Sequence, residues 1–298
     1  QEITYTLSRA AGEAVGGYAI TPAGDVLQGN AFSYFTNHVP KSSKILADIM
    51  NDCGYDYYTL GNHDFNYGLE YQKEYRDNHK GHCLCQNVLD DAGNHLYPYE
   101  IKVMPNGLRV GIVGIVTDYV NVWEKKENLV GVQVVDPFIE AQKALSELKG
   151  KTDINICIYH GGFEADLDTG KRLTDSTENV GYKICEELDF DVLLTGHQHM
   201  SVDGRFITSK TGHRTYVVQP LDAAKEYHLI EIDVVDNNNI MVTSKKIKAD
   251  YHRSVNFRET LEPQFYSDRN NFIVTLFNLN YGVEIGKTGK QENRKSGK

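Results

Sequence analysis

The sequence predicts an α/β fold, because short apolar runs alternate with segments of helical periodicity. The chain has 298 residues, of which 40% are hydrophobic and 24% charged, as is usual for a globular protein. Residues 108–117 (LRVGIVGIVT) are almost all apolar, which is typical of a strand buried on both faces. A β-rich stretch at residues 216–247 follows the alternating part, so helices and sheets should pack in layers.

The remaining elements are expected in the following order. Strands are expected at residues 154–159, 191–195, 216–219, 228–235 and 240–247. Helices are expected at residues 42–51, 137–149 and 179–188. The helix at 137–149 begins with Pro137 and stops before Gly150, as helices often do. Residues 1–17 are polar and rich in small residues, and they resemble neither a strand nor a secretion signal.

Charge and composition exclude several classes of partner. The formal net charge of −10 disfavours nucleic-acid polymers and anionic membranes. The sequence has no apolar run of about 18 residues, so we expect no membrane span. The five cysteines are odd in number and fit no zinc ribbon. A small anionic substrate would need a local positive charge, which bound metal ions can supply.

Four glycine-containing turns carry polar side chains of the kinds that bind metals. They are residues 24–30 (GDVLQGN), 61–68 (GNHDFNYG), 160–164 (HGGFE) and 196–199 (GHQH). The last two follow predicted buried strands directly, and such loops build the sites of α/β proteins. A single turn of this kind is more often structural, as an Asx-turn or a surface histidine. Four in one chain favour a functional site.

Hydrolysis of a phosphate ester would use these residue types together. Two divalent ions about 3.5–4 Å apart can hold the phosphoryl oxygens and acidify a water molecule between them. A shared carboxylate fixes the pair, while imidazole and amide ligands suit Mn, Zn, Fe or Co, with Mg as a further candidate. A further histidine that is not bound to metal can protonate the leaving oxygen.

The ordered motifs GD, GNHD, HGG and GHQH resemble the signature of the calcineurin-like metallophosphoesterases. The longer strings GNHDFNYGLEY, HGGFEADLDTG and LLTGHQH are similar to the bacterial 5′-nucleotidase and 2′,3′-cyclic-nucleotide 2′-phosphodiesterase branch. The resemblance implies a four-layer αββα sandwich with two mixed sheets and a dinuclear metal centre. It also implies hydrolysis of nucleotide phosphate esters, with a C-terminal domain that binds the nucleoside in full-length members.

The same resemblance assigns roles to residues of this sequence. As metal ligands it implies Asp25 between the two ions, Asn62, His160 and His197 on one ion, and His199 on the other. As catalytic residues it implies His63, Asp64 and Asn66, with His63 as the acid. Asn62 and His63 would also contact the substrate phosphate.

Three departures from the family pattern affect these expectations. The family opens with Asp-x-His, but residues 1–24 contain neither Asp nor His, so either an upstream strand is lacking or this copy is degenerate. Asn66 stands where some nucleotidases have Asp, and an amide orients a histidine but stabilises its charged form less. The stretch after Arg253 is too short for a nucleoside-binding domain. We therefore expect a metallophosphoesterase domain at residues 1–252, without its first strand, and a linker or remnant of a C-terminal nucleotide-binding domain at residues 253–298.

Two alternatives stay open at this point. One is a hydrolase of UDP-sugars or other small phosphoesters. The other is a truncated or degenerate non-catalytic domain that binds metal. The family further implies an extracytoplasmic location. The sequence indicates neither the native metal, the preferred nucleotide nor the oligomeric state.

Overall fold

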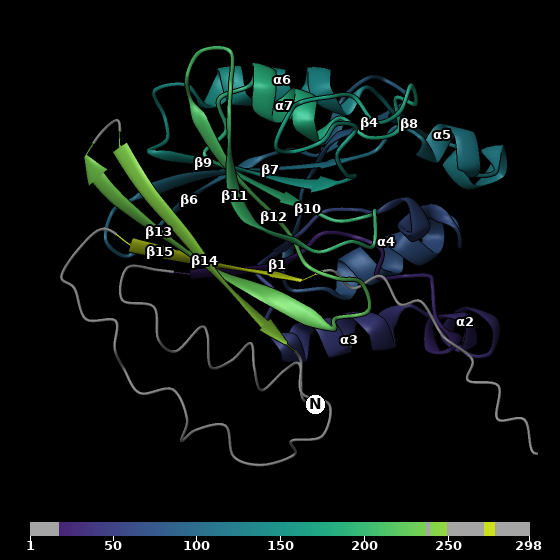
Figure 1. Ribbon diagram of the computed structural model, residues 1–298. Helices are drawn as coiled ribbons and strands as arrows, with labels where there is room; N and C mark the ends of the chain where they lie inside the picture. The colour runs from purple at the N-terminus through teal and green to yellow at the C-terminus, as the bar shows by residue number, and fades with distance from the viewer. Residues whose placement is uncertain (1–17, 237–238, 249–270, 278–298) are drawn as a thin grey trace, which may run out of the picture.

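The protein is built from two stacked sheets covered by helices on both outer faces. The computed structural model describes residues 18–236, 239–248 and 271–277. In Figure 1, helices α6 (Pro137–Leu148) and α7 (Gly181–Glu187) form the top layer, and helix α3 (Lys44–Cys53) lies at the bottom. The two sheets lie between them. The four-layer αββα arrangement expected from the sequence is confirmed.

The upper sheet has six strands in the order β11-β12-β10-β9-β7-β6. Its strands are β6 (Glu100–Val103), β7 (Arg109–Val116), β9 (Ile154–His160), β10 (Val192–Thr195), β11 (Val202–Thr208) and β12 (Arg214–Gln219). The four inner strands are parallel, and the two edge strands β6 and β11 run antiparallel to their neighbours. The sheet is therefore mixed.

The lower sheet has four strands in the order β1-β15-β13-β14. Its strands are β1 (Tyr18–Pro22), β13 (Glu226–Asp236), β14 (Asn239–Lys248) and β15 (Asn271–Phe277). Strand β15 pairs in parallel with β1 and antiparallel with β13. This sheet is also mixed, as expected.

Shorter elements complete the described part of the chain. The minor strands are β2 (Tyr57–Tyr58), β3 (His82–Cys83), β4 (Cys85–Asp90), β5 (His95–Tyr97) and β8 (Val132–Val134). The remaining helices are α2 (Ala31–His38), α4 (Leu69–Asn78) and α5 (Val120–Trp123), with 3₁₀ turns η1 (Asn62–Phe65) and η2 (Lys126–Leu129). No helix among these residues is both long enough and apolar enough to cross a membrane.

Alternate residues of the central strands fill two different cores. On β7, Val110 and Ile112 face the lower sheet, whereas Val113 and Ile115 pack in the cluster that contains α6 and α7. The same alternation runs through β9, β10 and β12. Because both faces of these strands are buried, their sequences are continuous apolar runs. That is the pattern from which they were predicted.

The expected helices and strands agree with the structure to within a few residues. One difference concerns the apolar run at residues 272–277, which is not among the strands expected from the sequence. In the structure it is β15, hydrogen-bonded between β1 and β13. The boundary expected at residue 252 lies in the undescribed range 249–270 and remains a prediction, and residues 1–17 also lie outside the described residues.

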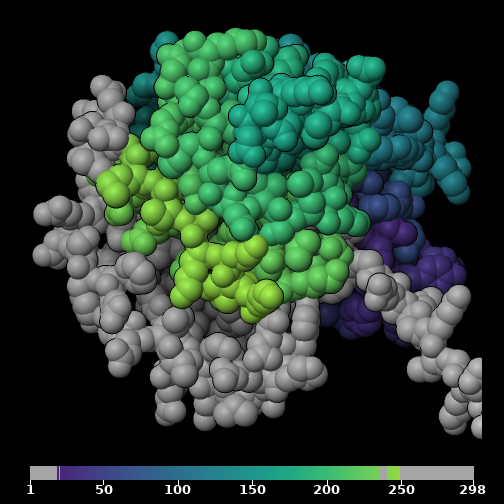
Figure 2. Space-filling view, viewed as in Figure 1, coloured from purple at the N-terminus to yellow at the C-terminus, as the bar shows by residue number. Residues whose placement is uncertain are grey.

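The β13–β14 hairpin is fastened to the upper sheet at its edge. Figure 2 shows this yellow-green hairpin lying directly beneath the green surface that contains β11 and β12. The hydroxyl groups of Tyr216 and Ser244 are 2.8 Å apart, and Lys246 forms an ion pair with Asp203. These polar contacts tie the two sheets together where the apolar core ends.

His79, at the end of α4, should make stability depend on pH. Its imidazole is buried against the rings of Tyr58 and Tyr75, and Nδ1 accepts the N–H of Gly81 at 2.8 Å. Burial lowers its pKa from 6.5 to about 4. As pH falls, the unfolded chain therefore binds the proton before the folded chain does. The contribution of His79 to the free energy of unfolding is fully present above pH 6.5 and is lost between pH 6.5 and about 4. The loss is on the order of 3 kcal/mol.

His79→Asn should remove this dependence, since the asparagine oxygen can still accept the N–H of Gly81. Urea unfolding at pH 7 and pH 4.5 would measure the difference between the variant and the wild type. His38→Asn, at an exposed position, is the matched control and should leave the pH dependence unchanged. An equal pH dependence in all three proteins would contradict the assignment.

Candidate metal centre and catalytic site

The four glycine-containing turns meet at one end of the sheets. Strand β9 ends at His160, and the turn that carries His197 follows the parallel neighbouring strand β10. Asp25 follows β1 after two residues, and η1 carries Asn62 and His63. Because parallel strands deliver their carboxyl ends to the same edge, these residues converge there.

Asp64 holds two of the turns together. It is buried, and its Oδ1 accepts the backbone N–H groups of Val26 and Leu27, both at 2.8 Å. Its Oδ2 accepts those of Gly61 at 2.7 Å and Asp25 at 3.0 Å. Four charge-assisted hydrogen bonds therefore fix the loop of Asp25 against the turn of Asn62 and His63.

Glycine is required where these two turns touch. A Cβ atom on Gly61 would lie 2.2 Å from Oδ1 of Asp25. Gly24 has a φ of 87°, and a Cβ there would lie 2.6 Å from the backbone nitrogen of Gly61. Any larger residue would separate the loops, which explains the glycine in each of these two motifs.

Three side-chain atoms that can accept hydrogen bonds, Nε2 of His160 among them, converge at one point. Nδ1 of His160 donates to the backbone carbonyl of Ala23, so in the neutral ring Nε2 carries a lone pair. Nε2 faces Oδ1 of Asn62 at 3.0 Å and Oδ2 of Asp25 at 3.2 Å. His160 is fully buried. Three buried acceptors in contact require a cation between them, either a proton or a metal ion.

His197 brings a fourth ligand to the same point. Its Nε2 donates to Oε1 of Glu178 at 2.8 Å, which leaves Nδ1 of the neutral ring free to bind metal. Ligand atoms of Asp25, His160 and His197 all lie within 4.8 Å of one another. With the amide oxygen of Asn62, this mixed nitrogen and oxygen set fits a divalent transition metal.

The pKa shifts follow the same geometry. Burial alone would raise the pKa of Asp25, but His160 outweighs it, with help from His63, and lowers that pKa to about 2. Burial would lower the pKa of His160, but Asp25 raises it. Burial and the neighbouring His160 lower the pKa of His197. The site therefore keeps a carboxylate and one neutral imidazole available as ligands.

His199 lies apart from this group of ligands. It is exposed, and the converging set found among the described residues does not include it. Asp25, His197 and His199 all have positive φ, at 60°, 69° and 52°. Such backbone conformations are unfavourable for these residue types and occur at functional turns. The structure thus brings together four of the five expected ligands.

A cavity of about 470 Å³ opens beside the ligands. Its lining consists of Asn62, His63, Asn66, Val120, Trp123, Glu124, Glu178, His197 and Gln198. Nδ1 of His63 is 2.7 Å from Oδ1 of Asn66, and the backbone N–H of His63 donates to Asp25. The expected catalytic acid therefore lines the same cavity as two of the candidate metal ligands, Asn62 and His197.

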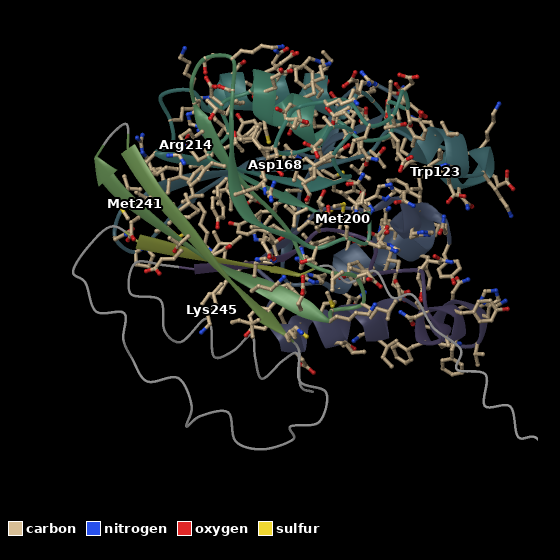
Figure 3. The ribbon with its side chains drawn as sticks, viewed as in Figure 1. Trp123, Asp168, Met200, Arg214, Met241 and Lys245 are labelled. Carbon is tan, nitrogen blue, oxygen red and sulfur yellow. The ribbon has the colours of Figure 1, made fainter. Side chains whose placement is uncertain are left out.

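Five residues of this lining were given no role from the sequence, and three of them carry polar or aromatic side chains outside the four motifs: Trp123, Glu124 and Glu178. Trp123 lies on α5, at the end of the molecule opposite Arg214 and Met241 (Figure 3), and its ring centroid is 5.6 Å from that of His197. Glu124 follows it, and Glu178 is the partner of His197. Trp123 is the only tryptophan in the chain, which could have identified it. No comparable pattern marks the two glutamates.

Comparisons with known proteins agree with this fold. The Calcineurin-like phosphoesterase family model matches residues 3–201. The trifunctional nucleotide phosphoesterase YfkN of Bacillus subtilis is 30% identical over 59% of this chain and 13% of its own length. A crystal structure of YfkN superposes with a TM-score of 0.68 over 83% of this chain and 81% of that chain, at 22% identity. That likeness shows the fold.

Two further relatives have names of the nucleotidase type. The 2′,3′-cyclic-nucleotide 2′-phosphodiesterase/3′-nucleotidase of Yersinia enterocolitica is 29% identical over 83% of this chain and 40% of its own length. The 5′-nucleotidase of Vibrio cholerae is 27% identical over 66% of this chain and 39% of its own length. The chain thus spans 40% or less of these curated relatives. With the family model, the fold and the convergent ligand turns in agreement, the chain belongs to the calcineurin-like phosphoesterase family.

Proposed function

We propose that this chain hydrolyses nucleotide phosphate esters, namely 5′-mononucleotides, 2′,3′-cyclic nucleotides or both. The observation that carries the proposal is the convergence of Asp25, Asn62 and His160 beside a cavity that His63 also lines. The names of the relatives support the substrate class. The UDP-sugar alternative has no observation of its own in its favour.

Asp25, Asn62, His160 and His197 would hold a divalent metal ion. Such an ion supplies a Lewis acid for the phosphoryl oxygens and lowers the pKa of a bound water molecule. Glu178 would orient His197 through its hydrogen bond, and Ala23 would orient His160 in the same way. A second ion would have only Asp25 and His199 among the expected ligands, so it should be held much more weakly than the first.

His63 would act as the catalytic acid. Its Nδ1 is occupied by Asn66, so Nε2 is the nitrogen that can give a proton to the leaving nucleoside oxygen. Asn62 and His63 would contact the phosphate. Asp64 would act as a positioning residue rather than touch the substrate, because both of its oxygens accept backbone N–H groups.

Trp123 would bind the nucleoside part of the substrate. Its side chain is 47% exposed, and it stands on the cavity wall near His63. An exposed indole beside a phosphate site offers a flat surface for a base or a sugar.

The extracytoplasmic location implied by the family resemblance remains a prediction.

Metal stoichiometry tests the ligand assignment. After loading with Mn²⁺ and desalting, elemental analysis should find one tightly held ion per chain, because the described residues converge on one position. Two tightly held ions would mean that His199 or residues outside the described ranges complete a second site. No bound ion would contradict the metal centre and favour a degenerate domain.

Two alanine variants separate metal binding from acid catalysis. His197→Ala should lose the metal, whereas His63→Ala should keep it and lose about 10²–10⁴-fold in turnover of AMP. Elemental analysis and steady-state kinetics on AMP and 2′,3′-cyclic AMP would measure both effects. Equal loss of metal in the two variants would overturn the assigned roles.

Trp123→Ala should raise KM for AMP by about tenfold, because base stacking is typically worth about 1–3 kcal/mol. KM for p-nitrophenyl phosphate, which has no nucleoside, should change much less. Val122→Ala is the control, since this exposed neighbour does not line the cavity. An equal increase of KM for both substrates would exclude a nucleoside-binding role.

A further inference from the structure

A chain of hydrogen bonds runs outward from His63. Oδ1 of Asn66 is 2.7 Å from Nδ1 of His63, and Nδ2 of Asn66 donates to Oε2 of Glu124 at 2.5 Å. Oε1 of Glu124 accepts the side-chain amide of Asn128 at 2.9 Å and the backbone N–H of Lys125 at 2.7 Å. Both oxygens of Glu124 are therefore engaged.

Asn128 fixes this arrangement from a second side. Its Nδ2 also donates to the backbone carbonyl of Asn66 at 3.0 Å. Glu124, Asn66 and Asn128 are all partly buried. Glu124 and Asn128 lie on the α5–η2 segment, whereas His63 lies in η1 and Asn66 directly follows η1. The segment over the cavity is thus hydrogen-bonded to the turn that carries the proposed acid.

The carboxylate determines which way the Asn66 amide points. An ionised carboxylate only accepts hydrogen bonds, so Asn66 must present its NH₂ group to Glu124. Its carbonyl oxygen then faces His63 and requires an N–H on Nδ1. The other nitrogen, Nε2, becomes the one that exchanges a proton. If the amide turned over, its NH₂ group would face Nδ1 and favour the opposite tautomer.

We propose that Glu124 is a positioning residue that, acting through Asn66, fixes the tautomer of His63 and so its competence as the acid for the leaving oxygen. The inference rests on the proposed function, in which His63 protonates the leaving group. Glu124 touches neither substrate nor metal in this scheme. The negative charge of Glu124 lies next to the amide of Asn66, and this amide separates it from the imidazole of His63.

Three variants change which of these groups donate hydrogen bonds and which accept them. In Glu124→Gln, the new amide can donate as well as accept, so Asn66 is free to turn over. In Asn66→Asp, two carboxylates would meet at the 2.5 Å contact and repel each other. In the double variant, the carboxylate introduced at position 66 can only accept from His63, and the amide introduced at position 124 can donate to that carboxylate. Either single change should be harmful, and the second change should correct the first.

Leaving groups reveal whether acid catalysis is the step affected. A nucleoside alkoxide needs protonation, whereas p-nitrophenolate is a stable anion that leaves without it. Glu124→Gln should therefore lower kcat for AMP by roughly 10-fold to 100-fold and change kcat for p-nitrophenyl phosphate little. The double variant should recover most of the loss on AMP. Glu127→Gln removes the same charge from an exposed position of the same segment and is the matched control.

A spectroscopic measurement tests the inference without turnover. ¹⁵N NMR of the histidine side chains, recorded on metal-free protein at mildly alkaline pH, distinguishes the two imidazole tautomers. His63→Ala assigns the signal. His63 should be the Nδ1–H tautomer in the wild type and in the double variant, and a mixture in Glu124→Gln. If the wild type hydrolyses no nucleotide, the proposed function fails, but the tautomers still test this inference.

The inference would be overturned by either of two results. One is an unchanged His63 tautomer in Glu124→Gln. The other is an equal loss of kcat on both substrates that the double variant does not recover, since a merely structural role would give that pattern. Elemental analysis of each variant should show unchanged metal content.

Discussion

The site depends on the carboxylate of Asp64, which accepts four backbone N–H groups from two separate loops. Backbone N–H groups in loops have no carbonyl partner from a helix or a neighbouring strand, and burying them without a hydrogen bond would lower the free energy of unfolding. One buried acidic side chain satisfies four at once and fixes Asp25 relative to Asn62 and His63. Asp64 thus organises the candidate site, although it is not among the residues proposed to bind metal or substrate.

The residues proposed to bind metal are held in unfavourable states. Asp25 and His197 have left-handed backbone conformations, and acceptor atoms face one another around His160. Each of these features costs stability when considered alone. A cation at the centre would relieve the electrostatic part, so binding and folding of these loops should be coupled.

The central strands, and most of the residues that converge at the candidate site, could be predicted from the sequence for a simple physical reason. Strands buried on both faces are continuous apolar runs, and β9 and β10 lead directly into histidines, at His160 and after one residue at His197. Other elements have no such pattern. Helix α2 buries Ser33 and Thr36 while Phe32, Tyr34 and Phe35 are exposed, so its apolar residues do not mark its inner face. Helix α4 buries Tyr71, Gln72 and Tyr75, which give little apolar periodicity.

Contacts between distant segments could not be predicted from local pattern. The four N–H groups bound by Asp64 include three that lie 37 to 39 residues earlier. Glu178 is 19 residues before His197, and Glu124 is 58 residues after Asn66. These polar pairs form only once the sheets have placed the loops. The apolar run of β15 was visible in the sequence, but its position between β1 and β13 was not.

The pairing of β1 with β15 has a consequence for the order of assembly. Strand β1 leads directly into the loop of Asp25, and one of its edges is hydrogen-bonded to a strand from the far end of the described chain. During synthesis, β1 must wait until residue 277 has been made before that edge is satisfied. Contacts of such high sequence separation form late, because closing the intervening loop costs entropy first. The carboxylate of Asp25 would therefore be among the last groups of this fold to settle, and binding of a metal ion there should follow the synthesis of residue 277.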